Sequence, residues 1–110
     1  MSNPYTQRGN VYRDDSSGIV PAFDYNNITA IGTTTVKATP GFFKGITLNT
    51  PVATSVITIY DSATGSGTKI GTITVPTSPQ PVTLDYNLAT KNGLTIVVAT
   101  AASDITVEYI

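Results

Sequence analysis

From residue 28 onward, apolar and polar residues alternate with a period of two, which is the period of a β-strand that buries one face. In residues 54–60, for example, Ile57 and Ile59 fall on one face, while Thr58 and Tyr60 fall on the other. Turn signals rich in Gly, Pro and Asn separate the segments. The alternating segments are residues 33–38, 42–48, 54–60, 68–75, 82–86, 94–98 and 105–109.

Short strands at this spacing predict an all-β fold, an antiparallel β-sandwich of the jelly-roll or Ig-like kind. An open barrel built from the same alternation is the alternative. Segments 54–60 and 68–75 predict a hairpin with a long, flexible tip at residues 61–67. In segment 42–48, the alternation places Phe42 with Ile46 and Leu48, on the face opposite Phe43.

Residues 1–27 show no strand or helix period and contain several turn signals. They predict an extended N-terminal arm that precedes a sandwich domain at residues 28–110. The arm would lie along a partner or along its own domain. Deleting it should leave the sandwich folded and should weaken attachment to the partner. The side chains expected to make the partner contact are Tyr5, Tyr12, Ile19, Val20 and Phe23.

Composition supports the β assignment, because Thr, Ile and Val together supply 41 of the 110 residues. Cys, His and Trp are absent, which excludes disulfides, zinc held by Cys or His, and histidine acid–base chemistry. Six basic and seven acidic residues leave a net charge of −1. This balance gives no electrostatic reason to bind nucleic acid or an anionic membrane. Composition therefore argues against most enzymes.

Motifs for phosphate binding and acid–base catalysis are incomplete. Residues 65–69, Gly-Ser-Gly-Thr-Lys, resemble part of a phosphate-binding loop, but the first glycine of that motif is missing and a strand follows. Asp85 and Glu108 are the acids within strands, and both fall on the polar face rather than in a shared cleft. A hairpin tip and solvated strand faces account for these residues better.

Calcium is the metal that the remaining carboxylates could hold, through oxygen ligands. The candidate groups are Asp14, Asp15 and Asp24, or Asp61 with Asp104. No stretch has the alternating acidic ligands of a dedicated calcium loop, so solvated turn carboxylates are the better interpretation. The sequence predicts no metal and no cofactor.

Two other functions are open at this stage. A small hydrolase with a Ser–Lys pair would use Lys37, Lys44, Lys69 or Lys91, yet no serine lies in a nucleophile-elbow motif. A carbohydrate-binding module would stack sugars on Tyr60, Tyr86 or Tyr109, with Asp61 as a polar contact. The sequence predicts no catalytic residue.

The first residues, Met-Ser-Asn-Pro-Tyr, lack the basic and apolar regions of a signal peptide. The longest nearly apolar stretch, residues 96–102, is too short to cross a bilayer. We therefore expect synthesis in a cytoplasm and no membrane attachment.

Predicted strand faces carry Thr in place of Lys or Glu, which suits permanent contacts between proteins because no charge has to be desolvated. Over residues 33–110 the chain resembles small β-sandwich virion proteins of tailed bacteriophages. Three stretches carry the resemblance: Gly-Phe-Phe-Lys-Gly-Ile at 41–46, Ile-Thr-Ile-Tyr-Asp-Ser at 57–62 and Leu-Thr-Ile-Val-Val at 94–98. These are packing and turn residues, so no functional residue follows from the resemblance.

The resemblance implies a non-enzymatic structural protein of the virion, in the first place a capsid decoration or cement protein. A neck, tail or head-fibre component is the alternative within the same class. The expected partners are the major capsid protein or other virion proteins, together with further copies of this chain in a homo-oligomer. The protein would be made in the host cytoplasm and reside in the virion.

Overall fold

The computed structural model describes residues 11–14 and 18–110, with side chains described from Ala22 onward. This part of the chain forms ten strands and no helix. Two strands, β1 (Val11–Asp14) and β2 (Gly18–Pro21), pair with each other in a sheet of their own. The other eight are β3 (Asp24–Ile28), β4 (Gly32–Lys37), β5 (Gly41–Thr50), β6 (Val56–Asp61), β7 (Thr68–Thr74), β8 (Val82–Thr90), β9 (Leu94–Ala99) and β10 (Asp104–Tyr109).

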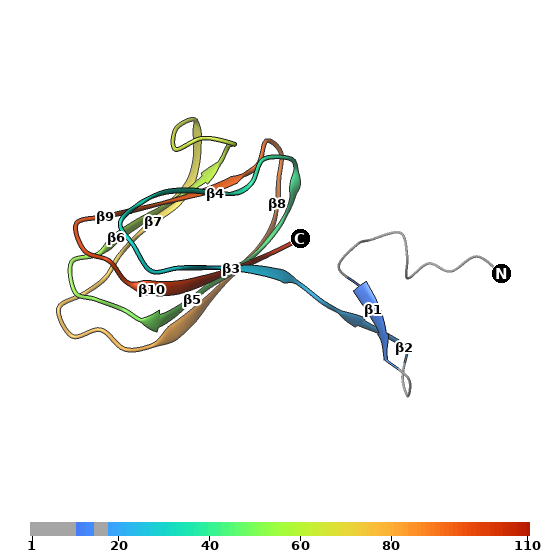
Figure 1. Cartoon of the computed structure of the whole chain (residues 1–110), viewed down its shortest axis with the longest axis horizontal. Coiled ribbons are helices and arrows are strands. Elements are labelled where there is room, and N and C mark those ends of the chain that lie inside the picture. Colours follow the sequence, from blue (N-terminus) through green and yellow to red (C-terminus); the bar gives the residue numbers. More distant parts are fainter. Residues whose placement is uncertain (1–10, 15–17) are drawn as a thin grey trace.

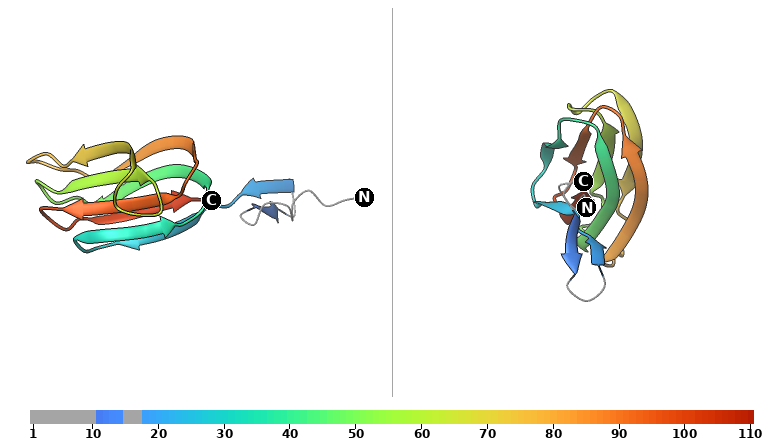
Figure 2. Two further views of the ribbon diagram at one scale, coloured as in Figure 1. Left: turned by 90° about the horizontal axis from the view of Figure 1, so that it is seen from above. Right: turned by 90° about the vertical axis from the view of Figure 1, so that its right-hand side faces the viewer.

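The eight strands form two antiparallel sheets, with strand orders β3-β10-β5-β8 and β4-β9-β6-β7. Figure 1 and Figure 2 show the sheets stacked face to face. The predicted β-sandwich is confirmed, and the open barrel is not formed because each sheet keeps two edges. The predicted hairpin is also present, since β6 pairs with β7. Other consecutive sandwich strands lie in opposite sheets.

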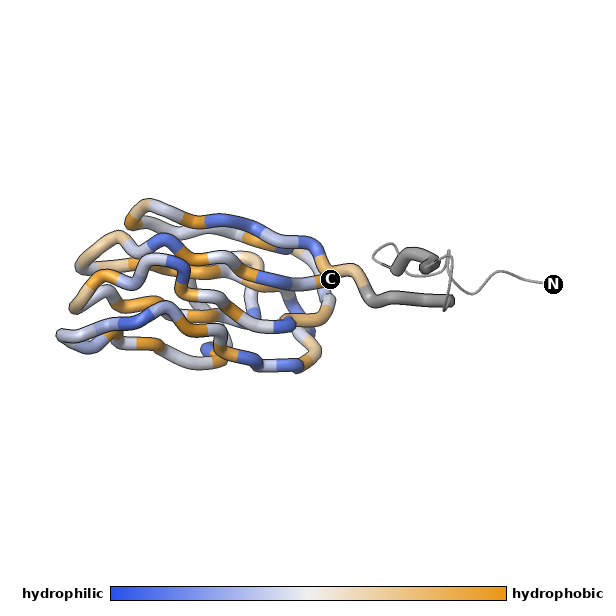
Figure 3. The backbone as a smooth tube through the Cα atoms, turned by 90° about the horizontal axis from the view of Figure 1, so that it is seen from below, coloured by the Kyte–Doolittle hydropathy of each residue, from blue (hydrophilic) through white to orange (hydrophobic). Residues whose placement is uncertain are grey.

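The core lies between the sheets and is made of the inward positions of the alternating pattern. Figure 3 shows apolar and polar residues alternating along the strands. Ile57 and Ile59 of β6 are fully buried, as the sequence predicted. In the part described with side chains, no buried side-chain nitrogen or oxygen lacks a hydrogen-bond partner. The buried apolar residues are Ile28, Phe43, Ile46, Leu48, Ile57, Ile59, Val75, Leu94, Ile96, Val98, Ile105 and Val107.

In β5 the predicted alternation, which put Phe42 on the same face as Ile46 and Leu48, does not hold along the whole strand. Phe43 is fully buried with Ile46, whereas Phe42 is half-buried. The pairing of β5 with β8 shifts register between Phe43 and Gly45, and this irregularity changes which residues face inward. Gly45 permits it, because a Cβ there would lie 2.2 Å from the backbone oxygen of Leu84.

The sandwich begins at β3, four residues before the boundary that the sequence predicted at Ile28. β3 pairs with β10 from Asp24 to Ile28, and the Asn27 side-chain amide donates to Asp104 Oδ1 at 2.7 Å. Asp24 to Asn27 show no apolar alternation, because β3 is an edge strand with a largely exposed face. A deletion of residues 1–27 therefore removes most of a sandwich strand.

The β6–β7 loop, predicted to be a flexible hairpin end, instead lies against the sandwich. The backbone oxygen of Ser62 accepts a hydrogen bond from Thr95 Oγ1 at 2.8 Å, and that of Ala63 accepts one from Thr35 Oγ1 at 3.0 Å. The loop therefore lies on the outer face of β4 and β9, and Thr95 is fully buried although it points away from the core. Threonines on this face bind a loop of their own chain.

Candidate binding surfaces

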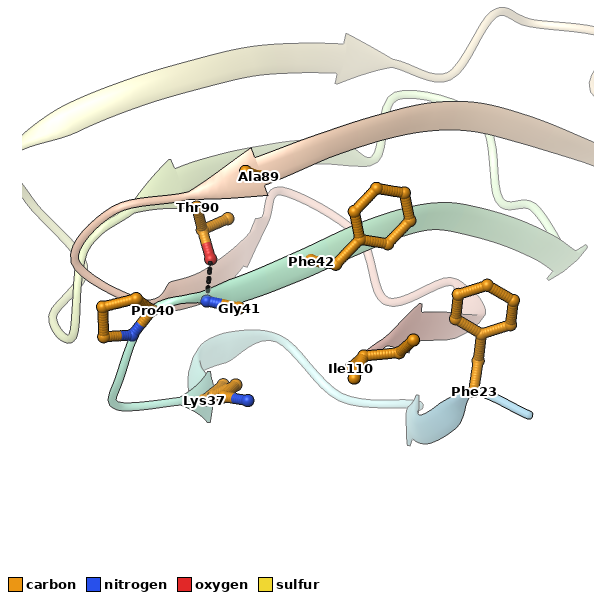
Figure 4. A pocket seen from close by; sticks show the side chains of 8 residues that line it. All are labelled: Phe23, Lys37, Pro40, Gly41, Phe42, Ala89, Thr90 and Ile110. Carbon is orange, nitrogen blue, oxygen red and sulfur yellow. Dashed lines mark hydrogen bonds between the residues drawn. The ribbon is translucent and has the colours of Figure 1, made fainter. Parts of the chain in front are cut away.

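An apolar groove of about 720 Å³ lies where the chain enters the sandwich (Figure 4). Its wall includes the rings of Phe23 and Phe42, whose centroids are 6.1 Å apart, next to the side chain of Ile110. Lys37 supplies the one charged side chain of the lining. The lining residues are Phe23, Lys37, Pro40, Gly41, Phe42, Ala89, Thr90 and Ile110.

Backbone pairing holds the floor of this groove rigid. Phe42 and Ile110 exchange two hydrogen bonds, at 2.9 and 2.8 Å, so the pairing of β5 with β10 continues to residue 110. Gly41 N–H donates to the buried Thr90 Oγ1 at 3.0 Å, and a Cβ at Gly41 would lie 2.2 Å from the Ile110 oxygen. The groove is thus a preformed surface whose floor is fixed by backbone pairing and whose lining is apolar apart from Lys37.

Of the five residues predicted to make the arm contact, the structure places Phe23 in this groove, against its own sandwich. Tyr12 of β1 lies opposite Val20 of β2 in the hairpin, and Ile19 lies opposite Arg13. Tyr5 falls outside the described residues. The predicted arm is therefore extended only in part, because residues 11–14 and 18–21 pair as a hairpin.

Asp61 connects the two sheets. At the end of β6 its Oδ1 accepts hydrogen bonds from the backbone N–H groups of Lys91 at 2.9 Å and Asn92 at 2.8 Å, in the turn between β8 and β9. Burial raises the pKa of Asp61, but these N–H donors, Gly93 N–H and the charge of Lys91 together lower it more, so the pKa lies below its ordinary value. Asp61 therefore stabilises the β8–β9 turn. The sequence contains no signal that links Asp61 to this turn, which lies thirty residues further along the chain.

Asp61 and Asp104 do not approach each other, because they end β6 and begin β10 at opposite ends of the sandwich. Asp104 Oδ1 instead accepts from the amides of Asn27 and Asn49, at 2.7 and 3.2 Å. Within the described residues, no group of three or more acidic, histidine or cysteine side chains is arranged to hold a metal ion. Asp15 of the other predicted group falls outside those residues.

The three tyrosines proposed as a sugar platform do not share a face. Tyr86 stacks on the buried Phe43 ring at a centroid distance of 4.8 Å, and burial raises its pKa. Tyr109 also packs against the core, from β10. Tyr60 belongs to the other sheet, at an outward position of β6. Two of the three rings therefore belong to the packing between the sheets.

The outer face of sheet β3-β10-β5-β8 carries small polar side chains bonded to one another across the strands. Thr47 Oγ1 donates to Glu108 Oε1 at 2.8 Å and lies 3.1 Å from Thr83 Oγ1. The Asn49 amide donates to Thr106 Oγ1 at 2.8 Å. An ion pair at 3.0 Å joins Lys44 and Asp85 on the same sheet. This face is polar, and the carboxylates of Asp85, Asp104 and Glu108 on it outnumber the ammonium group of Lys44.

Comparison with protein-family models, with curated proteins and with solved structures found no match to this chain. The described residues include no helix that is long and apolar enough to cross a membrane.

Proposed function

We propose that the chain is a non-enzymatic structural protein of a bacteriophage virion, a capsid decoration or cement protein that attaches through its N-terminal arm and its sandwich. Its partner would be the major capsid protein or another virion protein. A place in the neck, the tail or a head fibre is the alternative within this proposal. The protein would be made in the host cytoplasm and carried in the virion.

One observation carries the proposal: β1 and β2 form a two-stranded sheet of their own, separate from both sandwich sheets. An isolated hairpin is at best marginally stable in water, so it gains most by packing on a further surface. Extended and hairpin segments add to a partner through main-chain hydrogen bonds and side-chain pockets. An arm of this kind suits a subunit that is fastened to a larger particle.

Two further features support the proposal. The hairpin is joined to the sandwich beside the rigid groove, where Phe23 packs on Phe42. The outer face of sheet β3-β10-β5-β8 carries threonine and asparagine side chains that bond to one another and to the carboxylate of Glu108. Groups that already have hydrogen-bond partners within the chain can be buried in an assembly at a lower cost than unpaired ones.

Mass spectrometry of purified particles tests the proposal directly. The chain should be present in many copies, at a number comparable to the major capsid protein for a decoration role and far lower for a neck or tail role. Its absence from particles would overturn the proposal. Electron microscopy of particles that carry a labelled copy would then separate head from neck and tail.

The role of the arm is tested with a chain that lacks residues 1–22 and keeps Phe23 and β3. This variant should remain folded and should occupy particles at a lower level than the full chain, because the hairpin is gone. Phe23→Ala in the full chain is the matched control, since it alters the groove and keeps the hairpin. If the shortened chain occupies particles as fully as the full chain does, the sandwich and not the hairpin makes the contact with the particle.

A further inference from the structure

The loops at the end of the sandwich opposite the arm contain no charged residue. Four loops meet there, residues 29–31, 51–55, 75–81 and 100–103, and none contains Asp, Glu, Lys or Arg. Asp104 begins β10 beside these loops, and its carboxylate accepts hydrogen bonds from Asn27 and Asn49. We call these loops, with Val82 at the start of β8, the tip. Figure 1 and Figure 2 show the loops at the end away from the hairpin.

Large apolar side chains are exposed at the tip. Among the residues described with side chains, those that are exposed, large and apolar are Ile31 at 56%, Val52 at 39%, Val82 at 44% and Tyr25 at 73%. The first three belong to the tip. The pairing of β3, β10, β5 and β8 puts Ile28, at the end of β3, and Val82 in one row across the sheet, three strand spacings or roughly 14 Å apart. Ile31 follows β3 and Val52 follows β5 at this same end of the molecule.

The tip is held rigid by two buried serines. Ser55 Oγ donates to the Ala101 oxygen at 2.7 Å, and Ser103 Oγ accepts from Val52 N–H at 2.9 Å. Both serines are almost completely buried. They fasten the β5–β6 loop to the β9–β10 loop, so little conformational entropy is lost when the tip meets a partner.

The tip also contains backbone strain. Thr54 and Thr100 have φ angles of 70° and 73°, in a region that β-branched residues rarely adopt. Thr100 is the centre of a three-residue turn closed by Ala101 N–H and the Ala99 oxygen at 2.8 Å. These positive φ angles set the backbone shape of two of the four loops.

The chemistry of the tip selects among possible occupants. It contains no aromatic ring on which a sugar could stack and no cation that could meet a lipid headgroup. An apolar protein surface fits it best. A second copy meets this requirement, because four loops without charged residues can face the same loops of another copy. The carboxylate of Asp104 beside them points to the outer face of its sheet, where the amides of Asn27 and Asn49 donate to it.

We propose that the tip is the surface through which two copies of this chain associate end to end about a two-fold axis. The contact would bury Ile31, Val52 and Val82 of both copies. The two arms would then point away from each other, so that one dimer presents two attachment segments. This inference names the surface for the homo-oligomer expected from the sequence, and it does not depend on a virion role.

Sedimentation equilibrium of the full chain, from about 10 μM to about 1 mM, is the first test. The apparent mass should rise toward that of a dimer. Ile31→Lys and Val82→Lys should each weaken association by about tenfold or more, because each places two like charges at one contact. Both positions are exposed, so an unchanged circular dichroism spectrum and Tm should accompany the loss.

Tyr25→Lys is the matched control, since it makes the same kind of change at an exposed apolar residue outside the tip. It should leave association unchanged. A wild-type chain that stays monomeric throughout, or tip variants that associate as the wild type does, would overturn the inference. Co-sedimentation of a monomeric wild type with phosphatidylcholine vesicles would overturn it in favour of a lipid contact.

Discussion

At position 45, a single methyl group would collide with the backbone of the neighbouring strand. A Cβ on Gly45 would lie 2.2 Å from the Leu84 oxygen, whereas one on Gly71 would meet only the Tyr86 hydroxyl, at 3.7 Å. Gly45→Ala should therefore lower the free energy of unfolding by about 1–3 kcal/mol, the usual cost of overpacking. Gly71→Ala should change it by less than about 0.5 kcal/mol. Urea unfolding of both variants checks the difference, and equal effects would contradict the predicted clash.

The Asp61 carboxylate makes stability depend on pH. Its pKa is lower in the folded chain than its ordinary value of 3.8, so its contribution is present above pH 3.8 and is lost as the pH falls through the folded-state pKa. Asp61→Asn should lower the Tm at pH 7, because the backbone N–H groups of residues 91–93 lose a charged acceptor.

Calorimetry from pH 7 down to about pH 2 measures this dependence, and the gap in Tm between wild type and Asp61→Asn should narrow over the acid part of the range. Asp85→Asn is the control. Asp85 is an exposed partner of Lys44, and such ion pairs contribute little. A gap that stays constant with pH would show that the Asp61 charge is not the cause.

At the scale of elements, β3 determines how many N-terminal residues can be deleted without lowering the stability of the sandwich. A chain that lacks residues 1–22 keeps β3, and its Tm should stay near that of the full chain. A chain that lacks residues 1–28 also loses the buried Ile28 and the Asn27–Asp104 hydrogen bond, and it exposes the edge of β10. Its Tm should fall clearly and it should aggregate more readily. Equal melting curves for the two truncations would contradict a structural role for β3.

At the scale of the whole molecule, the low charge determines how strongly attachment to particles depends on salt. The groove beside the arm has one charged side chain, Lys37, and the net charge is −1. Attachment to particles should therefore change by less than about threefold between about 0.05 and about 0.5 M NaCl, since salt screens only charge–charge terms. Binding measured by co-sedimentation over this range checks it. A loss of several orders of magnitude would indicate a contact made by charged groups such as Arg8 and Arg13.

The alternating pattern predicted the sandwich, the β6–β7 hairpin and most of the core, because burial of one strand face imposes a period of two on the sequence. β3 escaped prediction, because an edge strand buries little and needs no apolar alternation. The pattern also failed locally at Phe42 and Phe43, because a register shift changes which side chains face the core. Such a shift cannot be recognised from the order of apolar and polar residues.

Among the surfaces, the sequence determined what kinds of groups are available: few charges, many threonines, no histidine or cysteine, and an apolar group of residues near the N-terminus. Which groups meet was decided only by the tertiary structure. Phe23 and Phe42, Asp61 and Asn92, and the tip residues Ile31, Val52 and Val82 are far apart along the chain. Strand order and the stacking of two sheets bring them together, and such long-range contacts follow from the closure of the whole core rather than from any local pattern.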